Sequence, residues 1–147
     1  MTQPAGILPD HCHETLLGVL ARADAASLKA FAEPLIADLG EIEVRENRTG
    51  LVMLPMRDTA QGTHFHLGEV LVSEAHIASG GFDGYGMRCG RDLEAAMAMA
   101  IVDLCVALGL HTDACNAFVT AEATAQSGKD RDTLRRVEAT RVEMETF

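Results

Sequence analysis

The stretch Leu93–Leu110, LEAAMAMAIVDLCVALGL, decides the fold class. Glu94 and Asp103 are its only charged residues, so a helix here is apolar almost all round and must be covered on more than one side. It is shorter than the roughly 20 residues that span a bilayer, and a charge near its middle costs about 2.5–3.5 kcal/mol there. We predict a packed helix in a soluble protein, with a sheet on one face and a partner chain on another.

The residues before this helix have the period of strands. Glu41–Arg45 alternates polar and apolar side chains, whereas Leu51–Met56 is apolar on both faces and predicts a central strand that ends or bulges near Pro55. A long extended stretch follows, with a bend at Gly68, and then a last strand. The predicted strands and turns lie at residues 41–45, 47–50 (turn), 51–56, 58–62 (turn), 63–78, 79–81 (turn) and 84–89. These short connections favour an antiparallel meander of four or five strands.

Helices are predicted on both sides of this meander. A first helix carries Leu16 and Leu20 on one face after a cap at Asp10. A second begins at Asp24, kinks or restarts at Pro34 and ends at Gly40. In the last third, Asp92 caps the apolar helix, a further helix runs from 111 to about 126, Ser127-Gly128 breaks it, and Asp132 caps a final charged helix. The chain is therefore predicted to be α+β, with N-terminal helices, the meander and C-terminal helices packed on the sheet, in a single domain, 1–147.

Charge and cysteine usage exclude several classes of protein. The 22 acidic and 12 basic residues leave a net charge of −10, which argues against nucleic acid or an anionic membrane as a partner of this chain alone. The four cysteines include no CxxC pair and predict reduced, mostly buried thiols in a cytoplasmic protein. The N-terminus has neither a basic region nor a long apolar run of a signal peptide.

Histidines offer the first candidate chemistry. His64 and His66 are two residues apart on a predicted strand and so share a face, as metal ligands can. His11, Cys12 and His13 are three ligand types in a row, but adjacent residues at a helix start point in different directions. A metal hydrolase built on these five residues is one hypothesis, and half-exposed strand histidines with a structural helix start are the alternative.

Glycines and Arg91 offer the second candidate chemistry, the binding of an anion or a nucleotide. Gly84-x-Gly86 matches neither the dinucleotide fingerprint nor a P-loop. Arg91 and the helix start at Asp92 could hold an anion, although a turn, a cap and a surface arginine explain the same residues. Serine and cysteine nucleophile motifs do not stand out, so we predict no catalytic residue, metal or cofactor.

An ordered set of short motifs resembles the PhnG family, the G subunit of the bacterial carbon–phosphorus lyase core complex. The motifs are Glu46-x-x-Thr49-Gly50-Leu51-Val52, Phe65-x-Leu67-Gly68-Glu69-Val70-Leu71-Val72, Gly84-Tyr85, Gly90-Arg91-Asp92 and the tail Glu138–Phe147. The tail departs from the family pattern, because Met144 replaces an expected aromatic residue and the chain stops at Phe147 where relatives often continue. A tail contact with a neighbouring subunit is in doubt for that reason.

The resemblance implies an accessory subunit in phosphonate breakdown. In this family the G, H and I subunits, with an ATPase-like L subunit, join an alkylphosphonate to the ribose C1 of ATP and displace adenine, and an iron–sulfur J subunit later cleaves the carbon–phosphorus bond. The expected partners are the H, I, J and L subunits, with docking mainly on I and J through helix 93–110 and the charged C-terminal helix. Binding or interface candidates are Glu69, Tyr85, Arg91, Asp92 and Arg141. The alternative function is a homo-oligomeric anion- or small-molecule-binding protein.

Overall fold

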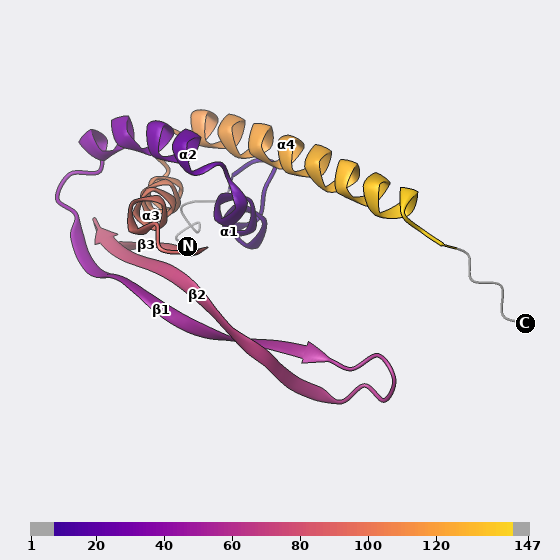
Figure 1. Ribbon diagram of the computed structural model, residues 1–147. Helices are drawn as coiled ribbons and strands as arrows, with labels where there is room; N and C mark the ends of the chain where they lie inside the picture. The colour runs from indigo at the N-terminus through magenta and orange to yellow at the C-terminus, as the bar shows by residue number, and fades with distance from the viewer. Residues whose placement is uncertain (1–7, 143–147) are drawn as a thin grey trace, which may run out of the picture.

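The computed structural model describes residues 8–142, which form an α+β fold (Figure 1). The elements in chain order are α1 (His13–Arg22), α2 (Ala25–Ala32), the 3-10 helix η1 (Glu33–Asp38), β1 (Glu43–Arg57), β2 (His64–Ser79), β3 (Phe82–Cys89), α3 (Leu93–Ala107) and α4 (Thr112–Ala139). The α+β class is confirmed. The predicted four or five strands are wrong, because the described residues form three.

The sheet is an antiparallel meander in the order β1-β2-β3. The predicted turn at 47–50 is absent because β1 runs straight through it, with Thr49 opposite Ser73 and Gly50 opposite Val72. Pairing with the continuous strand β2 stabilises the extended backbone there. This pairing outweighs the local preference of Asn and Gly for a turn. The turn predicted at 58–62 is confirmed, and the Asp58 carboxylate accepts hydrogen bonds from the main-chain N–H groups of Ala60 and Gln61.

A bulge lies where Pro55 and Gly68 predicted an irregularity. Leu54 faces Gly68 but Pro55 faces His66, so Leu67 is an extra residue on β2. A second register shift separates Val44 from Glu46 on β1. Both strands extend far past β3, and they form a bent two-stranded ribbon that leaves the rest of the molecule (Figure 1).

Helix α3 lies on β2 and β3 and is enclosed by this chain's own elements. It also contacts β1 and the helical segments α1, α2, η1 and α4, and eleven of its residues are buried. Closest approach is at β3, where a Cβ on Gly84 would lie 2.3 Å from the Ala100 carbonyl oxygen and one on Gly86 would lie 2.2 Å from that of Ala96. The prediction that a partner chain covers a second face of this helix is wrong, because four helical segments in the same chain do so.

The N-terminal helices follow the sequence prediction in part. The Asp24 carboxylate accepts from the Ser27 N–H and caps α2, and Pro34 lies at the start of η1, where the α-helix ends. Asp10 is not a helix cap, because α1 begins at His13 with Cys12 in the cap position; the Asp10 side chain instead accepts from Asn116 on α4.

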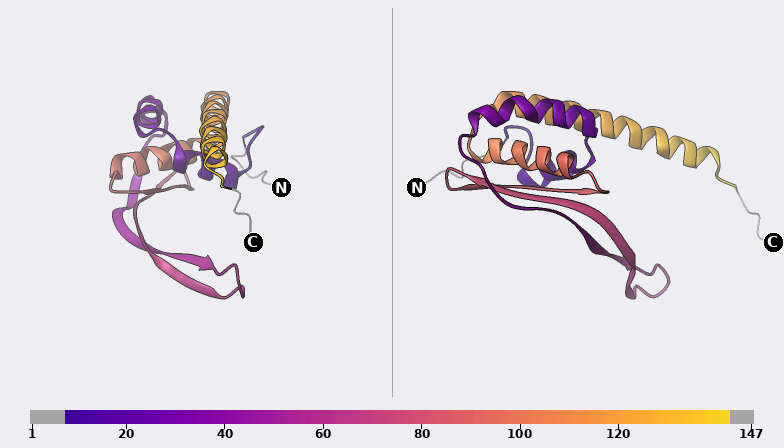
Figure 2. Two further views of the ribbon diagram at one scale, coloured as in Figure 1. Left: turned by 45° about the vertical axis from the view of Figure 1, so that its right-hand side comes forward. Right: turned by 60° about the vertical axis from the view of Figure 1, so that its left-hand side comes forward.

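Helix α4 is longer than predicted and does not pack on the sheet. It continues through Ser127-Gly128, where a break was expected, and contacts α1 and α3 instead. A glycine inside a helix costs only about 1 kcal/mol relative to alanine, which the ordered residues on either side offset. Its second half runs beyond the other helices (Figure 2). The tail positions Met144 and Phe147 lie outside the described residues.

Two further observations concern the cysteines and the apolarity of the helices. The prediction of mostly buried thiols holds for Cys105 and Cys115, whereas Cys12 and Cys89 are exposed. Between residues 8 and 142, none of the helices has the length and apolarity needed to cross a membrane.

Candidate protein-binding surface

The distal part of the β1–β2 ribbon, residues 51–71, is called the arm, and the rest of the described residues 8–142 is called the body. It carries a concentration of exposed large apolar side chains: Leu51, Val52, Met53, Leu54, Met56, Phe65 and Leu67. Exposed apolar surface on this scale is typical of sites that bind another macromolecule. The arm is therefore the first candidate functional surface of the molecule.

Both faces of the arm are apolar. Val52 lies opposite Val70, and the next residue pair, Leu51 and Leu71, points to the other face because successive side chains alternate. In the body of the sheet, the second of these faces continues into Ala75 and Ile77, which are buried against α3. The prediction of a central strand at 51–56 is wrong for the chain alone. Helix α3 packs on the sheet only outside the arm, so both faces of the arm are exposed.

The predicted residues on the arm are Glu69, His64 and His66. Glu69 lies opposite Met53 and is exposed, and the two histidines lie at the distal end opposite Arg57 and Pro55. Histidine, cysteine, aspartate and glutamate side chains within residues 8–142 form no group of three that could hold a metal ion.

The three residues at the start of α1 diverge, as their spacing predicted. His11 Nε2 lies 2.9 Å from Thr120 Oγ1 on α4, Cys12 Sγ lies 3.1 Å from Thr15 Oγ1, and His13 Nε2 lies 2.7 Å from Asp103 Oδ1 on α3. The five-residue metal hydrolase is contradicted by this geometry, because His11, Cys12 and His13 turn to three different elements and His64 and His66 lie on the arm.

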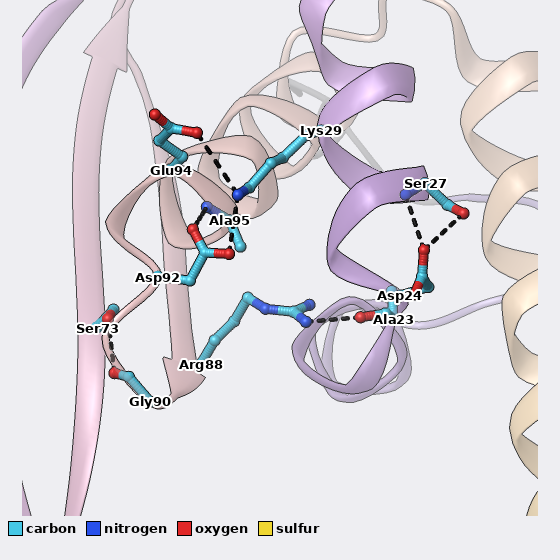
Figure 3. Close-up of polar contacts among 10 residues, drawn as sticks. All are labelled: Ala23, Asp24, Ser27, Lys29, Ser73, Arg88, Gly90, Asp92, Glu94 and Ala95. Atoms are coloured by element: carbon cyan, nitrogen blue, oxygen red, sulfur yellow. Dashed lines mark hydrogen bonds and ion pairs between the residues drawn. The ribbon is translucent and has the colours of Figure 1, made fainter.

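Asp92 performs the capping role at the start of α3 (Figure 3). Its carboxylate accepts from the Ala95 N–H at 3.0 Å and forms a 2.8 Å ion pair with Lys29, and this lysine holds the pKa of Asp92 below its usual range. Lys29 also lies 3.5 Å from Glu94. Two carboxylates thus occupy the positive end of the helix, where a bound anion would meet repulsion. Arg91 is exposed, and its side chain has no hydrogen bond or ion pair with residues 8–142.

Arg88 is a structural residue that the sequence analysis missed. Its guanidinium donates at 2.6 Å to the Ala23 carbonyl (Figure 3). It also donates to the Leu20 carbonyl, at the C-terminal end of α1. Burial lowers the pKa of Arg88, so these carbonyl bonds and the nearby carboxylates of Asp92 and Asp24 must compensate for lost hydration. Side chains alternate along a strand, so Arg88 lies on the same face of β3 as Gly84 and Gly86. This spacing was the signal in the sequence that Arg88 faces inward.

Tyr85 joins the two faces of β3. Its main-chain N–H donates to Asp103 Oδ2 at 2.9 Å, and its hydroxyl donates to Glu74 Oε1 at 2.8 Å. Burial, followed by the bond to Glu74, raises the pKa of Tyr85 to about 12. Glu74 also pairs with Arg48 at 3.2 Å, so the outer face of the body carries a paired polar network rather than an apolar patch.

Asp103 was noted in the sequence only as an interruption of the apolar helix. It is 4% exposed, and its two oxygens are met by His13 and by the Tyr85 main chain. A lone charge within an apolar helix is a usable signal, because a buried carboxylate must find a partner.

The second half of α4 is the other exposed surface. All residues from Lys129 to Val142 are exposed, including Arg141, which pairs with Glu138 at 3.2 Å. The basic residues of this segment, called the basic helix, are Lys129, Arg131, Arg135, Arg136 and Arg141; the acidic ones are Asp130, Asp132 and Glu138. Five against three leave a net charge of +2 over residues 129–142, and Glu143 and Glu145 follow directly in the sequence. An exposed pair such as that of Arg141 contributes little stability.

Comparison with known proteins places the chain in a family. The sequence profile described as "Phosphonate metabolism protein PhnG" matches residues 13–147. The chain is also similar to the alpha-D-ribose 1-methylphosphonate 5-triphosphate synthase subunit PhnG of Rhizobium meliloti (strain 1021), with 34% identity over 131 residues, which are 88% of this chain and 83% of that protein. The profile match, residues 13–147, contains all of the described helices and strands, the arm and the basic helix included. The chain therefore belongs to the PhnG family of phosphonate metabolism proteins.

Proposed function

We propose that this chain is an accessory subunit of a ribose 1-methylphosphonate 5-triphosphate synthase, the assembly named for its Rhizobium meliloti relative. In this role it supports the transfer of the ribose triphosphate part of ATP to an alkylphosphonate with release of adenine. The observation that carries the proposal is the arm, whose apolar faces are exposed in the lone chain. Surface of this kind is stabilised when a partner subunit removes it from water.

The partners that we propose are the H, I, J and L subunits of the carbon–phosphorus lyase system, with the I and J subunits as the main contacts. The charged C-terminal helix, here the basic helix, stays a docking element. The arm replaces helix 93–110, because that helix is buried within the chain. Glu69 on the arm and Arg141 on the basic helix remain interface candidates. Tyr85 and Asp92 have structural partners inside the chain, which favours a supporting role for both. A cytoplasmic location, where the exposed thiols stay reduced, belongs to the same proposal.

Reconstitution tests this function. The H, I and L subunits are mixed with ATP and methylphosphonate, with and without this chain, and adenine release is measured. We expect release only when the chain is present, and we expect it to co-purify with the I subunit. Equal adenine release without the chain would overturn the accessory role.

A further inference from the structure

We propose that one different polypeptide encloses the arm on both faces and presents an acidic surface to the basic helix. This inference rests on the proposed function and adds to it the chemistry of the partner: an apolar slot that admits a two-stranded ribbon, with carboxylates beside it. The occupant is a neighbouring subunit rather than a second copy of this chain.

The enclosure follows from the alternation of side chains along the arm. Leu51 and Val52 are neighbours, so they point to opposite faces, and their side chains are 63% and 43% exposed. A partner that lay flat against one face would leave the other in water. Strands that are apolar on both faces are normally buried on both, so the partner must supply apolar surface on each side of the ribbon.

A second copy cannot supply that surface. Within residues 8–142 six large apolar side chains are exposed outside the arm. Three lie on the basic helix, Leu134, Val137 and Val142, and three lie singly on η1, β1 and β3, Ile36, Val44 and Phe82. The arm is the one concentrated apolar surface in this part of the chain, and packing arm on arm would cover one face of each and leave the other exposed. Covering both faces therefore requires a chain with a different surface.

Charge indicates the rest of the partner's chemistry. The basic helix projects from the same side of the body as the arm in Figure 1 and in the right-hand view of Figure 2. Arg131 and Arg136 have no ion pair with residues 8–142, and Arg135 has only a 3.7 Å pair with Asp132 one turn away. Three arginines close together on one helix, without strong ion pairs to the described residues, are attracted to an acidic surface and repelled by a basic one.

The ribbon also has an unpaired edge that could receive a partner strand. Strand β3 ends at Cys89 opposite Val72. Among residues 8–142, the edge of β2 from His64 to Leu71 therefore has no neighbouring strand on that side, and its one bond there joins the Gly90 N–H to the Leu71 carbonyl. Such an edge is a template for strand addition. Partner backbone could pair there while partner side chains cover the two faces.

The test measures affinity of the full chain for the purified I subunit, with one charge placed on each face of the arm. We expect Leu51→Glu and Val52→Glu each to weaken binding at least tenfold, because either glutamate would be buried in an apolar slot. The matched control is Ile36→Glu, at a side chain that is also 43% exposed but lies on η1; it should stay within twofold of wild type. All three sites are exposed, so circular dichroism and melting temperature should match the wild type.

The basic helix is tested by charge. The double variant Arg135→Glu/Arg136→Glu should bind more weakly and show a flatter dependence on salt, whereas Arg135→Lys/Arg136→Lys should retain wild-type affinity and salt dependence. Equal loss in both double variants would overturn the electrostatic contact with an acidic surface.

Each of the remaining outcomes would contradict one part of the proposal. If only one arm variant loses affinity, the arm lies flat on the partner and is not enclosed. If neither does while the wild type binds, the enclosure fails and the proposed function stands. Failure of the wild type to bind the I subunit overturns the function and the inference together. A wild-type homodimer in sedimentation that both arm variants dissociate, with unchanged affinity for the I subunit, would make a second copy the occupant.

Discussion

Gly84 and Gly86 allow α3 to approach the backbone of β3. One methyl group added at Gly86 tests this close packing. In Gly86→Ala the new Cβ would lie 2.2 Å from the Ala96 carbonyl oxygen, so helix and strand must separate. We expect the free energy of unfolding to fall by at least about 1–3 kcal/mol, measured by urea denaturation. Gly50→Ala is the matched control, because it also lies on a strand but has open space, and it should change stability by less than about 1 kcal/mol.

The buried thiols make stability depend on alkaline pH. Burial raises the pKa of Cys105 to about 12 and that of Cys115 to about 11, from an ordinary value of 9.0. Above pH 9 the unfolded chain loses these protons while the folded chain keeps them. The free energy of unfolding therefore falls as pH rises from 9 toward 11, by up to about 1.4 kcal/mol per pH unit for each thiol.

Urea denaturation at pH 8, 9 and 10 checks this slope. The double variant Cys105→Ala/Cys115→Ala should remove most of it between pH 9 and 10, and Tyr85, with a pKa of about 12, should leave a slope only above its ordinary value of 10. Cys89→Ser, at an exposed thiol, is the control and should keep the wild-type slope. An unchanged slope in the double variant would contradict the assignment to the two buried thiols.

At the scale of the element, the continuity of α4 through Gly128 is open to test. A Cβ at Gly128 would meet no atom within 4 Å and its φ is not positive, so Gly128→Ala should stabilise the helix by about 0.5–1 kcal/mol and raise its ellipticity at 222 nm. Gly40→Ala is the control with the opposite sign: its Cβ also has open space, but φ is +70°. Loss of helicity in Gly128→Ala would show that the helix is interrupted at that point.

Local sequence predicted most element ends in the body. The caps Asp24 and Asp92, the end of α2 before Pro34 and, in the arm, the irregularity at Pro55 and Gly68 each follow from the chemistry of one or two residues. The turn expected at 47–50 and the break at 127–128 were wrong for one reason. Gly50 and Gly128 lie inside long elements whose neighbours on both sides are ordered, so regular structure continues across a weak position.

At the scale of the whole molecule, the arm and the body are energetically separable. The hydrophobic core contains no residue between 52 and 70, so replacing that segment with an Asn-Gly turn between Leu51 and Leu71 should leave cooperative unfolding intact. We expect the free energy of unfolding to change by less than about 2 kcal/mol and binding to the I subunit to be lost. Loss of cooperative unfolding in this variant would show that the arm supports the core.

The sequence by itself determined the α+β class, the order of helices and strands, and, through its ordered motifs, the PhnG family. These depend on the period of apolar residues and on local caps and turns, which act over a few positions. Only the tertiary structure decided which apolar surface is free. Helix α3 and the strand at 51–56 look equally in need of cover, yet four helical segments and the sheet enclose the first, while the second projects beyond them. The reason is geometric: burial depends on which distant segments reach a residue, and strand length carries the arm out of their reach.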